Sequence, residues 1–137
     1  MLVVVYTADG SALLLARREP PGYWQSVTGA LREGESPRDG AVRELREETG
    51  LEGTDLVDLG TSLRYLIAPA WRARYAPGVT HNVEHHFALR LPRPCAITLD
   101  PAEHATCTWL PLERAIERVA SSSNRAALEH VARADGP

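Results

Sequence analysis

The stretch GALREGESPRDGAVRELREETGL, covering Gly29–Leu51, carries the clearest structural signal in the sequence. Ser36 is a favourable N-cap, Pro37 suits the first helical position, and Asp39 partly completes a capping box. Gly50 supplies the stop at the C-terminal end. The stretch therefore predicts a loop and then a helix that ends at Gly50.

The second half of this helix has an unusually acidic face. Glu44 lies three residues before Glu47 and four before Glu48, so the three carboxylates share one side. Neighbouring like charges destabilise an isolated helix, and the dipole disfavours anions near its C-terminal end. A divalent cation such as Mg²⁺, which prefers oxygen ligands, would resolve the conflict. For the acidic segment alone, a solvated face paired with Arg43 and Arg46 is the commoner explanation.

Length and composition fit one soluble domain spanning residues 1–137. The chain has 44% hydrophobic and 24% charged residues and a formal net charge of −3, which argues against a nucleic-acid polymer as partner. No apolar run is long enough to cross a membrane, and the opening MLVVVY lacks the features of a signal peptide. Cys95 and Cys107 form no disulfide framework. We therefore expect a reduced, cytoplasmic protein; the sequence does not predict its oligomeric state.

The remaining sequence predicts a mixed sheet with helices packed on it. Turn residues 7–11 separate two apolar runs and indicate a hairpin. The expected strands are Leu2–Tyr6, Ala12–Arg18, Trp24–Leu31, Leu56–Ile67, Val83–Leu91 and one that ends near Trp109-Leu110, with Pro69–Gly78 as an irregular segment. Apolar spacing predicts late helices over Leu112–Ala120 and Asn124–Ala134.

The spacing of the central stretch resembles the Nudix box. It reads Gly29, five residues, Glu35, seven residues, and then REL-x-EE-x-GL, which matches every fixed position of that signature. The chain therefore resembles members of the Nudix hydrolase family. The resemblance implies an α/β fold in which a mixed sheet lies between helices as an α/β/α sandwich, with the box forming a loop–helix–loop.

The resemblance also implies roles for residues of the box. By position, Glu44, Glu47 and Glu48 would ligate Mg²⁺, or alternatively Mn²⁺, and take part in hydrolysis of a phosphoanhydride. Glu35 and Arg43 would support the site by bracing loop and helix through an ion pair. Gly29 would allow close approach of the backbone and offer a carbonyl near the metal.

Segments outside the box resemble one branch of the family, which acts on dihydroneopterin triphosphate in bacterial folate synthesis. They are the approach WQSVTG at Trp24–Gly29, the segment RARYAPGVTHN at residues 72–82 with Glu84, and SSSNR at Ser121–Arg125. The resemblance implies that this small-molecule triphosphate is cut to the monophosphate and pyrophosphate. The residues implied are Arg17, Thr28 and Ser121 for substrate binding, and Glu103 as a further metal ligand and catalytic carboxylate.

Each of these assignments has a structural alternative. Arg17 could be an exposed residue at a strand end, Ser121 could belong to a loop leading to the last helix, and Glu103 could be a solvated acid. The relatives also carry a basic side chain ahead of the first strand, whereas this sequence starts almost at that strand. That contact is therefore expected to be absent or supplied by another residue.

Two other functions remain open at this point. One is a general pyrophosphohydrolase of (deoxy)nucleoside triphosphates, including oxidised ones; the other is a non-catalytic ligand sensor of Nudix fold, which the intact box carboxylates disfavour. A histidine metal site is not expected, because His85 and His86 point to opposite faces of a strand. His104 is better explained as a hydrogen-bonding neighbour of Glu103. Aromatic residues such as Trp109 could stack on a ligand but are core residues more often.

Overall fold

The computed structural model describes residues 1–66, 69, 77–78 and 81–135. One mixed sheet organises this part of the chain, with strand order β3-β2-β1-β6-β5; β4 pairs with β1 and β7 pairs with β2. β1 and β6 are parallel, and the other strand pairings among the described residues are antiparallel. The elements in chain order are β1 (Leu2–Thr7), β2 (Ser11–Arg17), β3 (Trp24–Gln25), β4 (Val27–Thr28), α1 (Pro37–Thr49), β5 (Val57–Leu66), β6 (His81–Leu91), β7 (His104–Pro111), α2 (Leu112–Arg118) and α3 (Ser122–Asp135).

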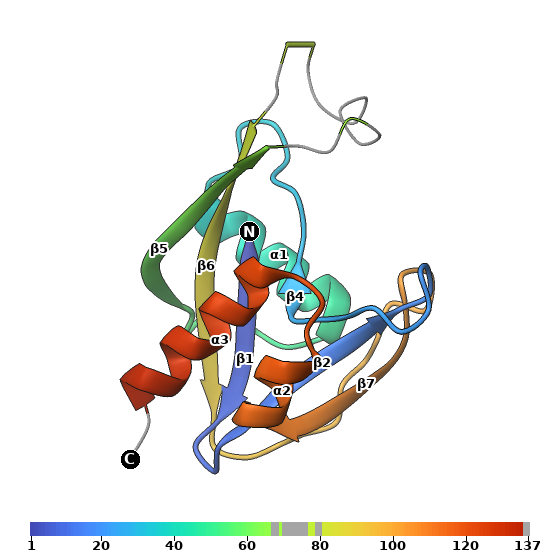
Figure 1. Cartoon of the computed structure of the whole chain (residues 1–137), viewed down its shortest axis with the longest axis vertical. Helices are drawn as coiled ribbons and strands as arrows, with labels where there is room; N and C mark the ends of the chain where they lie inside the picture. Colours follow the sequence, from blue (N-terminus) through green and yellow to red (C-terminus); the bar gives the residue numbers. More distant parts are fainter. Residues whose placement is uncertain (67–68, 70–76, 79–80, 136–137) are drawn as a thin grey trace.

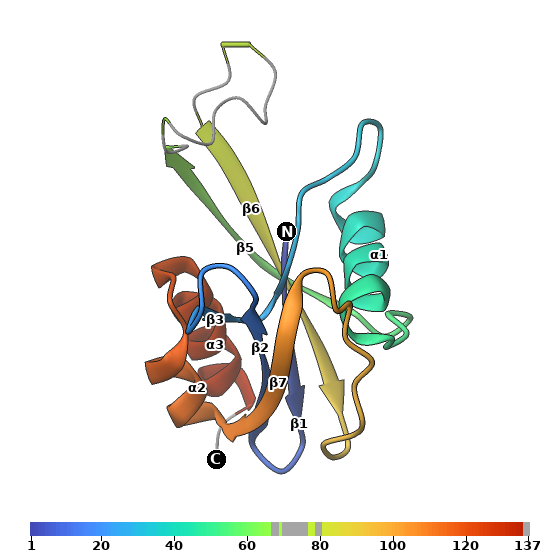
Figure 2. The ribbon, with the colours of Figure 1, turned by 90° about the vertical axis from the view of Figure 1, so that its right-hand side faces the viewer.

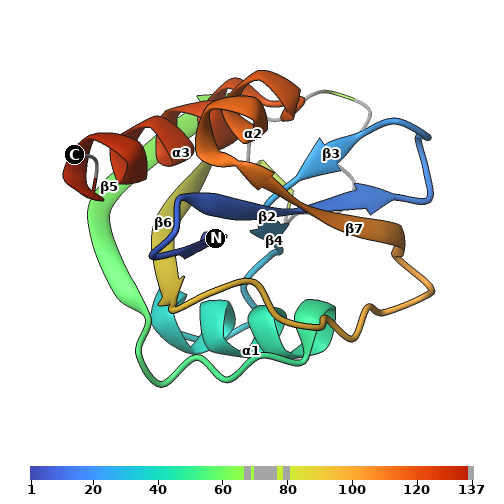
Figure 3. The same ribbon diagram turned by 90° about the horizontal axis from the view of Figure 1, so that it is seen from below.

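Helices cover both faces of the sheet, as Figures 2 and 3 show: α1 lies on one side, and α2 and α3 lie on the other. β1 explains how one strand serves both layers. Val3 and Val5 belong to the core cluster that also contains Leu45 of α1. Leu2 and Val4 belong to the second cluster, which contains residues of α2 and α3. Successive side chains of a strand point to opposite faces, so this continuous apolar run is buried on both faces of the sheet. The α/β/α sandwich is confirmed.

The helix over the acidic stretch forms as the capping residues predicted. The Ser36 hydroxyl accepts a hydrogen bond from the Asp39 amide at 3.1 Å. Gly50 ends the helix with φ of 78°, a left-handed conformation that suits glycine, and its amide donates to the Arg46 carbonyl. The Leu45 side chain is fully buried in the core that contains Val3 and Val5, which fixes how the helix is rotated on the sheet.

The single strand predicted over Trp24–Leu31 is wrong. The structure has two short strands on different neighbours: β3 pairs with β2, and β4 pairs with β1. Between them, Ser26 bonds a side chain instead of a strand, since its amide donates to Asn124 Oδ1 at 2.8 Å and its hydroxyl accepts from Asn124 Nδ2 at 2.9 Å. Asn124, which is distant in the sequence, thus supplies the hydrogen bonds that Ser26 does not make to a neighbouring strand.

The other elements agree with expectation apart from their ends. β1 and β2 form the predicted hairpin (Figure 1). α2 ends at Arg118 because Val119 is extended, and α3 begins at Ser122, before the predicted Asn124. The expected irregular segment, Pro69–Gly78, falls largely outside the described residues. Within the described part of the chain, no helix is long and apolar enough to cross a membrane.

Candidate active site

An ion pair joins the loop before α1 to the helix itself. Arg43 Nε and Nη2 contact the two carboxylate oxygens of Glu35, each at 2.8 Å, in a bidentate arrangement. Arg43 also donates to the Ala30 carbonyl at 3.0 Å, and Glu35 accepts from the Arg32 amide at 3.0 Å. The Arg43 hydrogen bond lowers the pKa of Glu35 to about 2, so Glu35 is ionised at neutral pH. The loop is therefore fixed to the acidic half of the helix.

The three helical carboxylates share one face but lie in different environments. Glu44 contacts Arg43 Nη1 at 2.7 Å, and Glu47 lies 3.4 Å from the same nitrogen. Their side chains are 14% and 46% exposed, whereas that of Glu48 is 2% exposed. Glu48 therefore forms the buried end of the acidic face.

Gly29 lies against this face at the end of β4. A Cβ atom added to Gly29 would lie 2.3 Å from Glu44 Cδ, well inside van der Waals contact. The glycine is therefore required by close packing rather than by an unusual backbone angle. Its carbonyl, expected to lie near the metal, accepts a hydrogen bond from the backbone nitrogen of Met1 at 2.8 Å.

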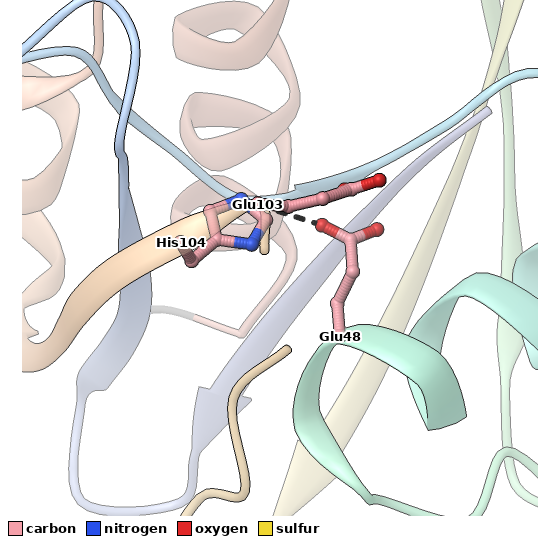
Figure 4. Close-up of side chains that lie close together, drawn as sticks. All are labelled: Glu48, Glu103 and His104. Carbon is pink, nitrogen blue, oxygen red and sulfur yellow. Dashed lines mark ion pairs between the residues drawn. The ribbon is translucent and has the colours of Figure 1, made fainter. Parts of the chain in front are cut away.

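Glu48 meets two residues at the start of β7, as Figure 4 shows. Potential ligand atoms of Glu48, Glu103 and His104 all lie within 4.8 Å of one another. Glu48 Oε1 is 3.6 Å from His104 Nε2, and neither Glu48 oxygen has a hydrogen-bond partner in the described part of the chain. Burial, followed by the neighbouring carboxylates, raises the pKa of Glu48 to about 10. Such an orphaned buried carboxylate beside another carboxylate and an imidazole fits a divalent cation.

An irregularity in the β2–β7 pairing brings this corner together. Ala16 pairs with Thr106 and Arg17 with His104, so the register shifts between them. The Arg18 amide donates to the Glu103 carbonyl at 3.1 Å, which ties the start of β7 to the end of β2. Burial and then the charge of Glu44 raise the pKa of Glu103, while burial and then the Arg17 cation lower that of His104. The neutral imidazole therefore retains a lone pair for a metal or proton.

A pocket of about 340 Å³ is lined by Arg17, Thr28 and Ser121, the three residues expected to bind substrate. The Arg17 guanidinium lies over the Tyr23 ring, 5.8 Å from its centre. Gln25 Nε2 is 3.4 Å from His104 Nε2, which joins the pocket wall to the carboxylate cluster. The full lining is Leu2, Arg17, Tyr23, Gln25, Thr28, Glu84, Ser121, Ser122, Ser123 and Asn124.

Ser121 has two structural roles at once. Its hydroxyl accepts a hydrogen bond from the Asn124 amide at 3.1 Å, so it caps α3. It also lines the pocket. The loop explanation and the substrate-binding explanation are therefore compatible at this position.

Several lining residues were not singled out from the sequence. Gln25 lies within the quoted Trp24–Gly29 approach and Tyr23 directly before it, but neither was given a role. Glu84 was noted only as part of a segment, and His104 only as a neighbour of Glu103. Long-range packing of β7 and β6 against β2 and β1 decides their place in the site.

Comparisons with known proteins agree with this fold and box. The family model described as NUDIX domain matches residues 1–131, and the chain therefore belongs to the Nudix hydrolase family. Two of its relatives are named dihydroneopterin triphosphate diphosphatase. The Escherichia coli K12 protein is 40% identical over 94% of this chain and 88% of its own length. The Haemophilus influenzae protein is 37% identical over 94% of this chain and 84% of its own length.

A solved structure supports the same relationship. The structure of the E. coli dihydroneopterin triphosphate pyrophosphohydrolase superposes with a TM-score of 0.84 at 40% identity, covering 93% of this chain and 90% of that chain. The similarity covers most of the chain. It is therefore not confined to the Nudix box.

Proposed function

We propose that this protein hydrolyses dihydroneopterin triphosphate to dihydroneopterin monophosphate and pyrophosphate. The observation that carries the proposal is that Arg17, Thr28 and Ser121 line one pocket, whose wall residue Gln25 lies 3.4 Å from His104 of the carboxylate cluster. Residues of the Trp24–Gly29 and Ser121–Arg125 segments, which are far apart in the sequence, line this pocket together with Arg17 and Glu84. The named relatives support the same substrate.

The proposed metal site consists of Glu44, Glu47 and Glu48 on α1 together with Glu103 at the start of β7. The ion is Mg²⁺, with Mn²⁺ as an alternative. When bound, it would neutralise phosphate charge and lower the pKa of a water molecule. The unpartnered oxygens of buried Glu48 support this assignment. His104, 3.6 Å from Glu48, is a further candidate ligand or hydrogen-bonding neighbour.

The chain's own residues account for binding and proton transfer. The planar guanidinium of Arg17 can donate two hydrogen bonds to phosphate oxygens. Thr28 and Ser121 offer hydroxyls to the phosphate or the heterocycle. Glu103, the exposed member of the cluster, would accept the proton of the attacking water. The water's oxygen forms the new bond to phosphorus, the anhydride bond breaks, and pyrophosphate leaves with the bonding pair.

A substrate panel tests this proposal against the nucleotide alternative. We expect kcat/KM with Mg²⁺ to be higher for dihydroneopterin triphosphate than for any canonical or oxidised deoxynucleoside triphosphate. A preference for a nucleotide would contradict the substrate assignment. Binding without turnover of every compound would instead indicate a ligand sensor.

The Glu48→Gln variant tests the proposed catalytic site. Because glutamine keeps the shape but cannot ionise to bind a cation, we expect turnover to fall by orders of magnitude with an unchanged circular dichroism spectrum. Near-normal turnover in this variant would remove the central role of Glu48. Glu113→Gln, on the exposed face of α2, is the matched control.

A further inference from the structure

One charged residue of the pocket has no part in the chemistry described above. Glu84 lies on β6 and lines the pocket together with Ser123 and Thr28. Its side chain is only 13% exposed. A carboxylate repels phosphate, so Glu84 in a phosphate-binding pocket needs another explanation.

A partly buried hydrogen-bond chain holds Glu84 in place. His86, two residues along the same face of β6, lies with Nε2 3.0 Å from Glu84 Oε1. The Nδ1 atom of His86 is 3.3 Å from the Thr61 hydroxyl on β5. With Nε2 protonated, the ring donates to Glu84 and accepts from Thr61, so both ring nitrogens are satisfied. Because His86 is 2% exposed, this orientation is fixed before any ligand arrives.

Glu84 also keeps its charge. Burial alone would raise its pKa, but hydrogen bonds from His86 and Ser123 outweigh this and lower the pKa below its usual value. Glu84 is therefore an ionised, acceptor-only group at neutral pH. A carboxylate offers about four acceptor directions, of which these two bonds use two.

The pocket therefore holds a cation, Arg17, and an anion, Glu84. Arg17, paired in register with His104, marks the side of the carboxylate cluster and of the phosphates. Glu84 supplies the acceptor for a neutral head group that presents N–H donors. Two adjacent parallel donors fit a carboxylate best, since both oxygens can then accept at once.

We infer that Glu84 determines specificity by accepting the ring N–H and the neighbouring exocyclic amino group of a 2-amino-4-oxo heterocycle. Pterin and guanine carry this pair of donors. Neutral adenine, cytosine and thymine do not, because none places a ring N–H beside an amino group. The inference rests on the proposed function and extends it: the phosphate chemistry selects triphosphates, and Glu84 selects the head group.

The test uses binding, so that it does not depend on turnover. Guanosine and inosine α,β-methylene triphosphates resist hydrolysis and differ only by the 2-amino group. We expect calorimetry on the wild-type protein to show roughly ten- to hundredfold tighter binding of the guanosine compound. In Glu84→Gln the ratio should fall to about threefold or less, with inosine binding little changed. Equal binding of both compounds by the wild-type protein would overturn the inference.

Two further outcomes distinguish recognition of the head group by Glu84 from a purely structural role of this residue. Equal weakening of both compounds in Glu84→Gln would mean that Glu84 only supports the pocket, and would overturn the inference. If that variant does not fold, Glu84→Asp keeps the charge but withdraws it by one methylene, and the ratio should fall severalfold. An unchanged ratio in a folded variant of either kind also overturns it. Glu129→Gln, exposed on α3, should retain the full ratio.

The same measurements distinguish this inference from the proposed function. A protein that binds with the expected ratio but hydrolyses no member of the substrate panel would contradict the proposed function and support the role of Glu84. Hydrolysis of dihydroneopterin triphosphate with equal binding of the two analogues would support the function and overturn the role of Glu84.

Discussion

Glu48 on α1 and His104 on β7 face each other at 3.6 Å, each with 2% of its side chain exposed. Neither residue could hold this position by local structure alone. The Nudix helix brings a carboxylate to the sheet, and the irregular β2–β7 pairing brings an imidazole and Glu103 to meet it. The buried end of the acidic face thereby joins a cluster of possible metal ligands, of which Glu103 is exposed.

We expect divalent metal to stabilise the protein through Glu48. An ion at about 100 times its dissociation constant adds roughly 2.7 kcal/mol to the free energy of unfolding. Thermal melts in Mg²⁺ and in chelator should therefore differ by several degrees in the wild-type protein. The difference should shrink strongly in Glu48→Gln and persist in Glu113→Gln. An equal metal-dependent shift in Glu48→Gln would place the ion elsewhere.

The Glu35–Arg43 ion pair should give stability a specific acid dependence. Because the folded pKa of Glu35 is about 2, below its usual 4.5, the ionised carboxylate stabilises the fold above pH 4.5. This contribution is lost as pH falls through about 2. Urea unfolding should show Glu35→Gln less stable than wild type at pH 7, with the gap narrowing between pH 4.5 and 2. A gap independent of pH would exclude this cause; Glu33→Gln, exposed on the same loop, is the control.

Gly29→Ala should impair activity by displacing Glu44. The added methyl group would overlap the Glu44 carboxylate, so the side chain or the end of β4 must move. We expect kcat to fall at least about tenfold and stability to fall by roughly 1–3 kcal/mol. Kinetics and urea unfolding would measure both effects. The exposed neighbour substitution Ala30→Ser should change neither, and normal kcat in Gly29→Ala would show that Glu44 tolerates displacement.

Asn124→Ala should destabilise the fold and distort the pocket wall. The substitution leaves the buried amide of Ser26 without its 2.8 Å acceptor and removes a second bond to the Ser26 hydroxyl. We expect a loss of about 3 kcal/mol in the free energy of unfolding, measured with urea. Ser122→Ala, at an exposed position, should cost little. A loss below about 1 kcal/mol would mean that water replaces the amide.

The helix of the box was predictable because its determinants are local. Ser36, Pro37 and Gly50 act within one turn of the residues they cap, so the sequence indicates both ends. The spacing of Glu44, Glu47 and Glu48 determines a shared face for the same reason. It does not determine that Glu48 is buried while Glu47 is half exposed, because burial depends on β7.

The strand over Trp24–Leu31 could not be predicted correctly for the opposite reason. Its interruption at Ser26 is stabilised by Asn124, which belongs to the last helix. A periodic pattern indicates which residues favour extended structure. It does not indicate that a distant side chain, here the Asn124 carboxamide, takes the place of a strand partner. The same limit applies to Glu84, whose place in the pocket depends on the parallel pairing of β6 with β1.

The sequence by itself therefore determined the capped helix, its acidic face, the family and the candidate residues, since these depend on short-range spacing. Only the tertiary structure decided that Arg17, Thr28 and Ser121 share one pocket, that Glu48 meets Glu103 and His104, and that Glu84 faces the same space. These relationships join strands and helices that are remote in the chain. Packing on the two faces of one sheet brings them together, and no local pattern encodes that contact.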